Sequence, residues 1–358
     1  MKTRRFFSVL LIVTALFSTF SCSNKENEAP KTAKNVIVMI GDGMGPAQVY
    51  SLILNSQDKT AFERFPYSGF SITKSASNEI TDSAAGGTAI AVGKKTKNGE
   101  VGMDPDSIAV PSMLELFAEQ GKKTGVVVTC SVTHATPADF IAHNINRGNN
   151  AEIALEISDK EGLDVLFGGG KKYFTERQDS LDLLGKMWEK GWNVYDSLEQ
   201  IEDNNARTMV LTCRKHMVKA PERGDFLPKA TAKAIEMLDN ENGFFLMVEG
   251  SQIDFACHDN DSATMVEEMI DFNKAVNAAL DFAERDGNTL VVVTADHETG
   301  GLTIIDPEGK YTRTDFKWTT KSHSAVFVPV FSFGPGAEKF SGIMDNTEII
   351  SKIMEVAK

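Results

Sequence analysis

Short apolar runs alternate with longer amphipathic segments along most of this chain, and no other feature constrains its fold as strongly. The apolar runs that predict buried strands are Asn35–Ile40, Thr124–Thr129, Asp164–Phe167, Phe244–Glu249, Thr289–Thr294 and Ala325–Phe331. The segments between them that predict helices are Pro46–Asn55, Ser83–Val92, Pro111–Glu119, Pro137–Asn144, Glu152–Ser158, Leu181–Glu189, Pro228–Asp239 and Ser262–Glu284. This order predicts a doubly wound α/β protein with a mainly parallel central sheet and helices on both faces.

Polar residues follow several of these strands at the point where each strand ends. They are Asp42 after the first strand, His134 and Thr136 after the second, Glu249 at the end of the fourth, and Asp296 and His297 after the fifth. The carboxyl ends of parallel strands meet at one edge of a sheet, and ligands bind along that edge. We therefore expect these side chains to gather into one site.

The size and net charge of the chain limit the classes of protein to which it can belong. A chain of 358 residues with 42% hydrophobic residues can bury a large core. The net charge of −13, with no basic stripe, argues against nucleic acid as a specific partner. An anionic substrate would therefore need cations within the site itself.

The N-terminal segment has the pattern of an export signal. A basic start is followed by the mostly apolar run Phe6–Phe20, which predicts a signal peptide over residues 1–21. Ser21 directly before Cys22 resembles the lipobox of bacterial lipoproteins, so residues 22–34 are interpreted as a lipid-modified Cys22 and a polar tether. We expect an exported lipoprotein, periplasmic or at the cell surface and anchored to the outer membrane, with an unmodified secreted form as the alternative.

The three remaining cysteines allow at most one disulfide bond, so the core must be stable without a disulfide framework. Whether Cys130 and Cys213 pair is open. Cys257 stands beside His258 and resembles a zinc ligand, but we interpret it as buried apolar filling.

One serine stands where a polar turn gives way to a helical segment of small residues, in the stretch from Thr81 to Ala89. At a helix start, Ser83 would face an incoming anion together with the helix dipole and free backbone N–H groups. Serine also caps helices without any chemical role. This stretch alone therefore leaves Ser83 open between a cap and a nucleophile.

Carboxylates and imidazoles occur at spacings that suit metal ions. Asp42 lies among glycines, where it could bridge two cations or simply occupy a tight turn. Asp254 and His258 are four residues apart, so a helical turn would place both on one face, as a shared zinc ion or a surface pair requires. Glu249 ends an apolar strand, where an unpaired carboxylate would be costly.

Asp296 and His297 form the strongest of these signals, because two polar ligand types at the end of a core strand are seldom structural alone. His323 supplies a further imidazole before the last predicted strand. Four of the six histidines fall in these segments, and they are His134, His258, His297 and His323. His143 and His216 show no such pattern. Arg147 could bind two phosphate oxygens or remain a solvated arginine.

Taken together, these residues resemble the alkaline phosphatase family, with motifs in matching order from Asp42 to His323. The resemblance implies one catalytic domain over residues 35–358, two zinc ions, one magnesium ion, and hydrolysis of phosphate monoesters through a phosphoserine. Matched motif by motif, the first zinc would be held by Asp254, His258 and His323, the second by Asp42, Asp296 and His297, and the magnesium by Asp42, Thr136 and Glu249. Ser83 would be the nucleophile, Arg147 would bind phosphate, Asp82 would help to orient it, and His134 would be an accessory ligand.

Some features depart from the family pattern. His134 stands where some members have an acid, and Phe255 stands where some have a Lys or His that reaches phosphate through water. The span from Glu298 to Lys321 is short, which implies a reduced crown and an open entrance. A homodimer is expected from the family. The alternatives are a phosphodiesterase of the same superfamily and a metal-binding lipoprotein without turnover, and Ser83 distinguishes the last of these.

Overall fold

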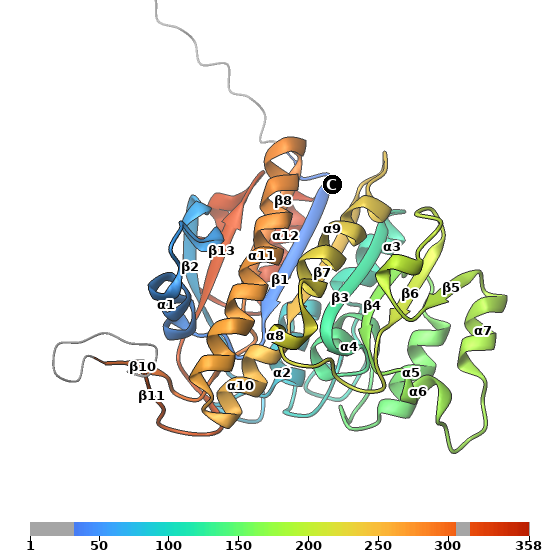
Figure 1. Cartoon of the computed structure of the whole chain (residues 1–358), viewed down its shortest axis with the longest axis horizontal. Coiled ribbons are helices and arrows are strands. Elements are labelled where there is room, and N and C mark those ends of the chain that lie inside the picture. The colour runs from blue at the N-terminus through green and yellow to red at the C-terminus, as the bar shows by residue number, and fades with distance from the viewer. Residues whose placement is uncertain (1–31, 306–315, 358) are drawn as a thin grey trace, which may run out of the picture. The chain divides into compact units, whose positions relative to one another are not determined.

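The computed structural model describes residues 32–305 and 316–357, and the predicted signal peptide lies outside these ranges. The central sheet has ten strands in the order β14-β2-β13-β8-β1-β7-β3-β4-β6-β5 (Figure 1). Their bounds are β1 Asn35–Gly41, β2 Tyr67–Ile72, β3 Lys123–Ser131, β4 Val165–Gly169, β5 Trp192–Tyr195, β6 Arg207–Leu211, β7 Phe244–Gly250, β8 Thr289–Thr294, β13 Val328–Phe333 and β14 Gly342–Asp345. Strand β13 pairs antiparallel with β8 and β2, and the other pairings are parallel. The predicted α/β class and mainly parallel sheet are confirmed.

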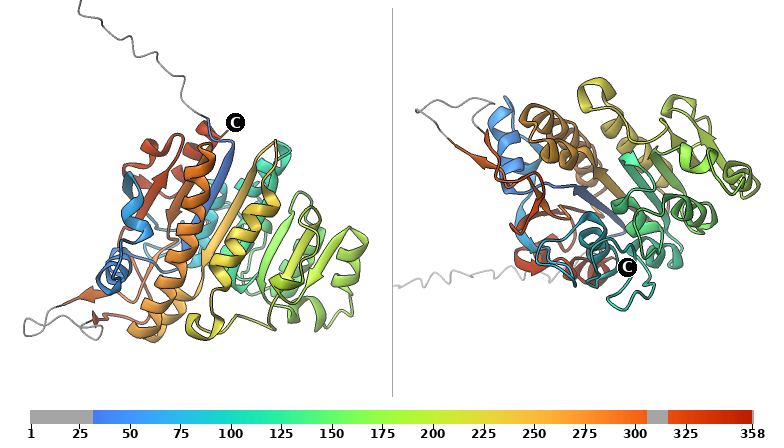
Figure 2. Two further views of the ribbon diagram at one scale, coloured as in Figure 1. Left: turned by 45° about the horizontal axis from the view of Figure 1, so that its top comes forward. Right: turned by 90° about the horizontal axis from the view of Figure 1, so that it is seen from below.

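Helices cover both faces of this sheet, as Figures 1 and 2 show. They are α1 Pro46–Asn55, α2 Ser83–Val92, α3 Met113–Glu119, α4 Ala135–Ile141, α5 Asn150–Asp159, α6 Lys172–Thr175, α7 Leu183–Glu189, α8 Ala220–Arg223, α9 Phe226–Leu238, α10 Gln252–Asp259, α11 Ser262–Asp286 and α12 Glu348–Val356. In the described part of the chain, no helix is both long enough and apolar enough to cross a membrane.

Alternate residues of β1 belong to different cores, which explains why its sequence is a continuous apolar run. Val36, Val38 and Ile40 pack in the core that includes residues of α2, α3, α4 and α12. Ile37 and Met39 pack in the core that includes residues of α9 and α11. A strand buried on both faces needs apolar side chains at every position.

Several predicted boundaries were wrong, mostly where a strand is half exposed. The predictions contained no strand for β2, β5, β6 or β14. Along β2, exposed residues outnumber buried ones, so it lacks the continuous apolar run of the central strands. The predicted strand from Ala325 begins instead at Val328, because Ala325, Val326 and Phe327 are exposed. At the other end of the described chain, Ala33 is buried and its N–H donates to the carbonyl of Val356.

Helix α2 is buried on every side, and small residues make this possible. A Cβ on Gly86 would lie 2.6 Å from the carbonyl oxygen of Asp296, and a Cβ on Gly87 would lie 2.1 Å from Oδ2 of Asp139. The two glycines therefore allow the helix to approach both acids closely. Close packing behind Ser83 therefore requires glycine at both positions.

Asp139 is a buried acid that packs against helix α2, and it should make the stability of the protein depend on pH. The side chain is buried, its Oδ1 accepts from Thr88 Oγ1 at 2.8 Å, and its Oδ2 lacks a hydrogen-bond partner. Burial raises the pKa of Asp139 well above its usual value. The native state therefore holds a proton that the unfolded state releases, so stability falls as pH rises above about 4.

We predict that Asp139→Asn removes this part of the pH dependence. The thermal midpoint of Asp139→Asn, relative to that of the parent protein, should be higher at pH 9 than at pH 5. The expected shift is roughly 2 °C or more, since one unit of pKa corresponds to about 1.4 kcal/mol. Thermal unfolding of both proteins in matched buffers measures it. An equal difference at both pH values would contradict the prediction.

Candidate active site

Four adjacent strands end at one edge of the sheet and bring the predicted residues together. Strand β1 lies between β8 and β7, and β3 follows β7. Ile40 pairs with both Glu249 and Thr294, so Asp42 and Asp296 leave their strands at the same level. Beside them is a hollow of about 490 Å³, whose lining includes Ser83, Arg147 and His323.

Ser83 is the first residue of α2, and Asp82 is its N-cap. The Asp82 Oδ1 accepts from the Ala85 N–H at 3.0 Å, so the cap is Asp82 and the Ser83 hydroxyl is left free for another role. That hydroxyl lies 3.2 Å from Nε2 of His297. Ser83 thus starts a buried helix with its oxygen directed at the acid and histidine cluster.

Asp82 also holds Arg147 at the site. Its Oδ2 accepts from Arg147 Nη1 and from the Gly99 N–H, both at 3.0 Å. The Arg147 backbone N–H donates to the Gly99 carbonyl at 2.8 Å, so chain and side chain are both fixed. Its Nη2 lies 3.4 Å from Nε2 of His134. The guanidinium is therefore oriented before any anion arrives.

Within residues 32–305 and 316–357, three groups of His, Cys, Asp and Glu side chains have ligand atoms within 4.8 Å of one another. They are Asp42, Asp296 and His297; Asp254, His297 and His323; and Cys130, His134 and Glu249. The group of Asp42, Asp296 and His297 is the set predicted for the second zinc ion. The group around Asp254 also contains His323, so it includes two of the three residues predicted for the first zinc ion.

His258 was predicted to bind the first zinc ion together with Asp254 and His323, and it lies in contact with both. Its Nε2 lies 3.3 Å from Oδ2 of Asp254 and 3.2 Å from Nε2 of His323. Its Nδ1 lies 2.6 Å from the carbonyl of Lys321, which fixes the ring. This hydrogen-bonded contact with Asp254 raises the pKa of His258 to about 9.

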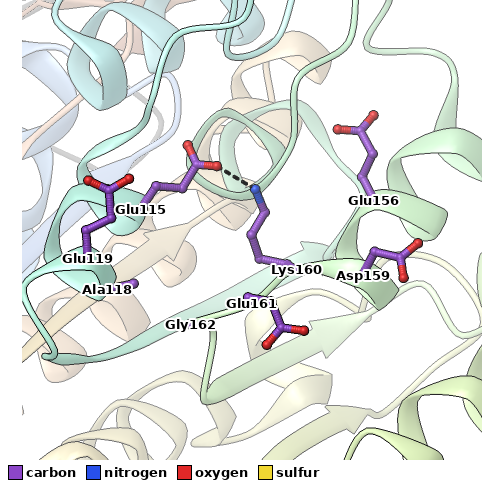
Figure 3. Close-up of a pocket in the computed structure, with 8 residues that line it drawn as sticks. All are labelled: Glu115, Ala118, Glu119, Glu156, Asp159, Lys160, Glu161 and Gly162. Atoms are coloured by element: carbon purple, nitrogen blue, oxygen red, sulfur yellow. Dashed lines mark hydrogen bonds and ion pairs between the residues drawn. The ribbon is translucent and has the colours of Figure 1, made fainter.

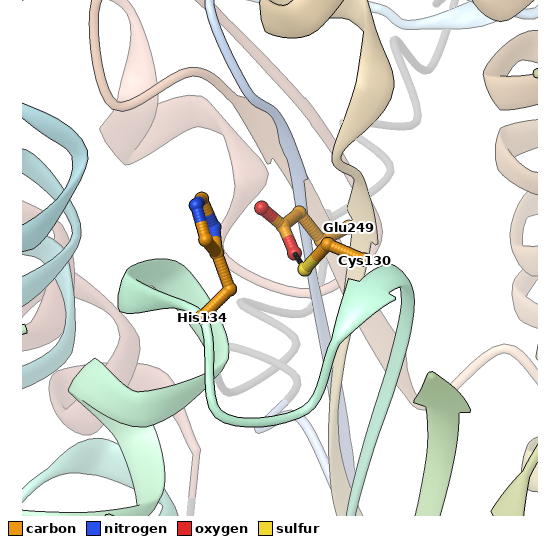
Figure 4. Close-up of side chains that lie close together, drawn as sticks. All are labelled: Cys130, His134 and Glu249. Atoms are coloured by element: carbon orange, nitrogen blue, oxygen red, sulfur yellow. Dashed lines mark hydrogen bonds between the residues drawn. The ribbon is translucent and has the colours of Figure 1, made fainter. Parts of the chain in front are cut away.

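Cys130 joins the third group, although the sequence was not interpreted that way (Figure 4). Its thiol donates to Oε2 of Glu249 at 3.4 Å, and Ser251 Oγ donates to the same oxygen at 2.7 Å. Oε1 of Glu249 and Oγ1 of Thr136 are left without partners. By contrast Cys257 is buried and accepts from Gln48, as expected for filling. Among the described cysteines none forms a disulfide bond, so the possible pair of Cys130 and Cys213 is absent.

The buried oxygens without partners test whether metal ions fit here. Both carboxylate oxygens of Asp42 and Oδ2 of Asp296 lack hydrogen bonds, although both residues are fully buried. Burial and the neighbouring acids Asp296, Asp254 and Glu249 raise the pKa of Asp42, and burial raises that of Glu249 to about 7. Buried acids this close are stable together only with bound cations or protons. The residues therefore fit divalent metal ions.

His216 lies closer to the site than its sequence context predicts. Its ring lies 5.5 Å from that of His134 and 5.1 Å from that of Phe255, measured between centroids. Its Nδ1 accepts from the Ser131 N–H. His216 follows β6, which was not predicted, and no local signal placed that loop beside His134. His143, by contrast, contacts Glu115 at 3.4 Å and belongs to none of these groups.

A second hollow, of about 540 Å³, has a different character (Figure 3). Most of its lining side chains are acidic. Glu115 binds Lys160 at 2.7 Å and His143 at 3.4 Å, and these hydrogen bonds outweigh the effect of burial and lower its pKa to about 2. Its lining contains none of the serine or histidine residues gathered at the strand ends, so we do not place the active site there.

A free serine at a helix start, a fixed guanidinium and a buried cluster of acids and histidines define the class of metal-dependent phosphoryl-transfer hydrolases. Residues 33–312 match the alkaline phosphatase family. Alkaline phosphatase 4 of Bacillus subtilis (strain 168) is 35% identical, over 91% of this chain and 89% of the relative. The alkaline phosphatase structure from the Antarctic bacterium TAB5 superposes with a TM-score of 0.86 at 41% identity, over 92% of this chain and 98% of that one. The cold-active enzyme from Shewanella sp. gives 0.84 at 30% identity, over 90% and 100%.

The chain belongs to the alkaline phosphatase family, and it is an enzyme that hydrolyses phosphate monoesters.

Proposed function

We propose that hydrolysis proceeds through a phosphoserine on Ser83. The observation that carries this proposal is the position of the Ser83 hydroxyl, which is not used for capping and lies 3.2 Å from His297 within the acid and histidine cluster. In the first step the Ser83 oxygen would bond to phosphorus, while the bond from phosphorus to the alcohol oxygen breaks. In the second step water would take the phosphoryl group, releasing phosphate and restoring the hydroxyl.

We propose two zinc ions, with Asp254, His258 and His323 holding one and Asp42, Asp296 and His297 holding the other. For Asp42, Thr136 and Glu249, whose oxygens suit a hard cation, we propose magnesium, with His134 as an accessory ligand. When bound, such ions lower the pKa of a coordinated hydroxyl and neutralise the charge of attacking and leaving oxygens. The oxygens of Asp42, Thr136 and Glu249 that lack partners support this assignment.

Arg147 would bind two non-bridging oxygens of the phosphoryl group, and Asp82 would hold it in place. The support is the ion pair of 3.0 Å, which orients the guanidinium without using all of its donors. The backbone N–H groups at the start of α2 add further positive potential.

We predict that Arg147→Ala lowers kcat/KM for a phosphate monoester by about 100-fold, since a preoriented charged donor is lost from the transition state. Steady-state kinetics of the metal-loaded protein measure this. The matched control is Arg64→Ala, because Arg64 forms a surface ion pair with Asp281 away from the strand ends. A change of less than threefold in Arg147→Ala would contradict the role.

The test of the proposed function combines an assay with metal analysis. The purified protein should hydrolyse a chromogenic phosphate monoester faster at alkaline pH and contain about two zinc ions per chain. Acid quenching during turnover should trap a phosphorylated peptide that contains Ser83. Turnover without any labelled Ser83 peptide would refute the mechanism.

We further propose an exported lipoprotein anchored through Cys22 to the outer membrane, on the basis of the sequence pattern of residues 1–22. We also propose a homodimer. Its support is a set of exposed apolar side chains on β2, on the edge strand β14 and in the segment before β13, which are Phe70, Ile72, Val326, Phe327 and Ile343. Exposed apolar residues grouped in this way are typical of a contact surface.

A further inference from the structure

Glu298 is a buried carboxylate next to the site, and the mechanism above gives it no role. It is 2% exposed and forms β9 (Glu298–Thr299), directly after His297. Strand β9 pairs antiparallel with β12 (His323–Ser324), so that Glu298 lies opposite Ser324 and Thr299 opposite His323. Each strand has only two residues, and a pairing this short is not stable by itself.

Four uncharged donors converge on the Glu298 carboxylate. Oε1 accepts from Gln48 Nε2 at 3.0 Å and from the Leu302 N–H at 3.1 Å. Oε2 accepts from the Gly301 N–H at 3.2 Å and from the hydroxyl of Ser324. These donors come from α1, from the turn after β9 and from β12. One side chain therefore joins its own turn to β12 and to α1, which is distant in sequence.

The turn that carries Asp42 packs directly on Glu298. A Cβ added to Gly45 would lie 2.3 Å from Cγ of Glu298, so only glycine fits at position 45 without displacing it. Gln48 also donates to the Thr299 carbonyl at 2.9 Å. The carboxylate is thus held tightly from the side of the Asp42 turn as well.

The two histidines next to these contacts are held face to face. The rings of His297 and His323 lie 3.5 Å apart between centroids and 17° from parallel. His323 reaches this position after the connection that follows β10 (Thr303–Ile304) and β11 (Phe316–Lys317), and its Nδ1 lies 2.8 Å from the Thr81 carbonyl before the nucleophile. The neighbouring pair of Glu298 and Ser324 fixes the backbone from which both rings project.

We propose that Glu298 is a positioning residue, which ties β9 to β12 and thereby sets His297 and His323 at the separation that metal binding requires. The proposal rests on the metal sites of the proposed function. Groups behind metal ligands commonly change metal affinity by 10- to 100-fold when they are removed.

The test measures zinc affinity of Glu298→Gln and Glu298→Ala by competition with a chromogenic chelator, in the absence of substrate. The expected result is weaker binding of at least one zinc ion, by 10- to 100-fold, with kcat/KM of Glu298→Gln recovering at high zinc. Gly45→Ala should also lower the zinc affinity, since its new methyl group displaces Glu298. Ser324→Ala, which removes one hydrogen bond, is the milder variant if the others fail to fold.

Glu268→Gln is the matched control, because Glu268 is an equally buried carboxylate paired with Arg223 outside the metal groups. It should lower thermal stability and leave zinc affinity unchanged. Zinc affinity within threefold of the parent in all folded variants of Glu298 and Ser324, or an equal loss in Glu268→Gln, overturns the proposal. Because no substrate is present, this outcome is independent of whether Ser83 forms a phosphoserine.

Discussion

Ser83→Ala is expected to abolish turnover of phosphate monoesters, with kcat at least about 1,000-fold below that of the parent protein. The hydroxyl is the group placed for attack, whereas the other hydroxyl beside His297, that of Thr299, donates to Asp254. Asp82 would still cap α2 through the Ala85 N–H, so the helix and the fold should be retained. Zinc content and thermal midpoint should therefore stay near the parent values while the rate falls.

Ser71→Ala is the matched control for this experiment. Ser71 is fully buried, its hydroxyl lacks a hydrogen-bond partner, and it lies on β2, which β13 separates from β8, outside the lining of the hollow at the site. Removing its hydroxyl should leave kcat unchanged. If Ser83→Ala retains more than a tenth of the parent kcat with its zinc bound, another group must be the nucleophile.

The central strands could be predicted from sequence because they are buried on both faces, and this requires a continuous apolar run. Val36 to Ile40 and Leu290 to Val293 show this pattern, and β1 and β8 lie there. The outer strands β2, β5 and β14 could not be predicted in the same way, since only part of each is buried. A short, half-exposed run resembles a loop until the neighbouring strand is known.

Residues at the ends of the central strands were predicted to meet for the same reason. Once β1 and β8 are adjacent, Asp42 and Asp296 must lie side by side. The contacts of His216 and Glu298 could not be predicted in this way. His216 reaches His134 through a loop after an unpredicted strand, and the contact between Glu298 and Ser324 depends on a two-residue pairing. Such contacts depend on tertiary packing, which local sequence patterns do not encode.

Removing bound metal should have an effect as large as the loss of Ser83, and it should change stability as well as rate. Extraction with a chelator should lower activity below about 1% of the starting value, and added zinc should restore it. Metal that binds only the native state at 1,000 times its Kd contributes about 4 kcal/mol, so the thermal midpoint should fall by several degrees.

The physical reason is the same arrangement that makes the site reactive. Asp42, Glu249 and Asp296 are fully buried and close together, and without a cation each disfavours ionisation of the others. The control is the same chelator already saturated with zinc, which should change neither activity nor midpoint. The contrary outcome is an extracted protein that keeps its rate with less than about a tenth of a metal ion per chain. In that case the buried acids would have to be stabilised by protons, and Ser83 would need a base among the chain's own residues. His297, at 3.2 Å, would then be the group to test.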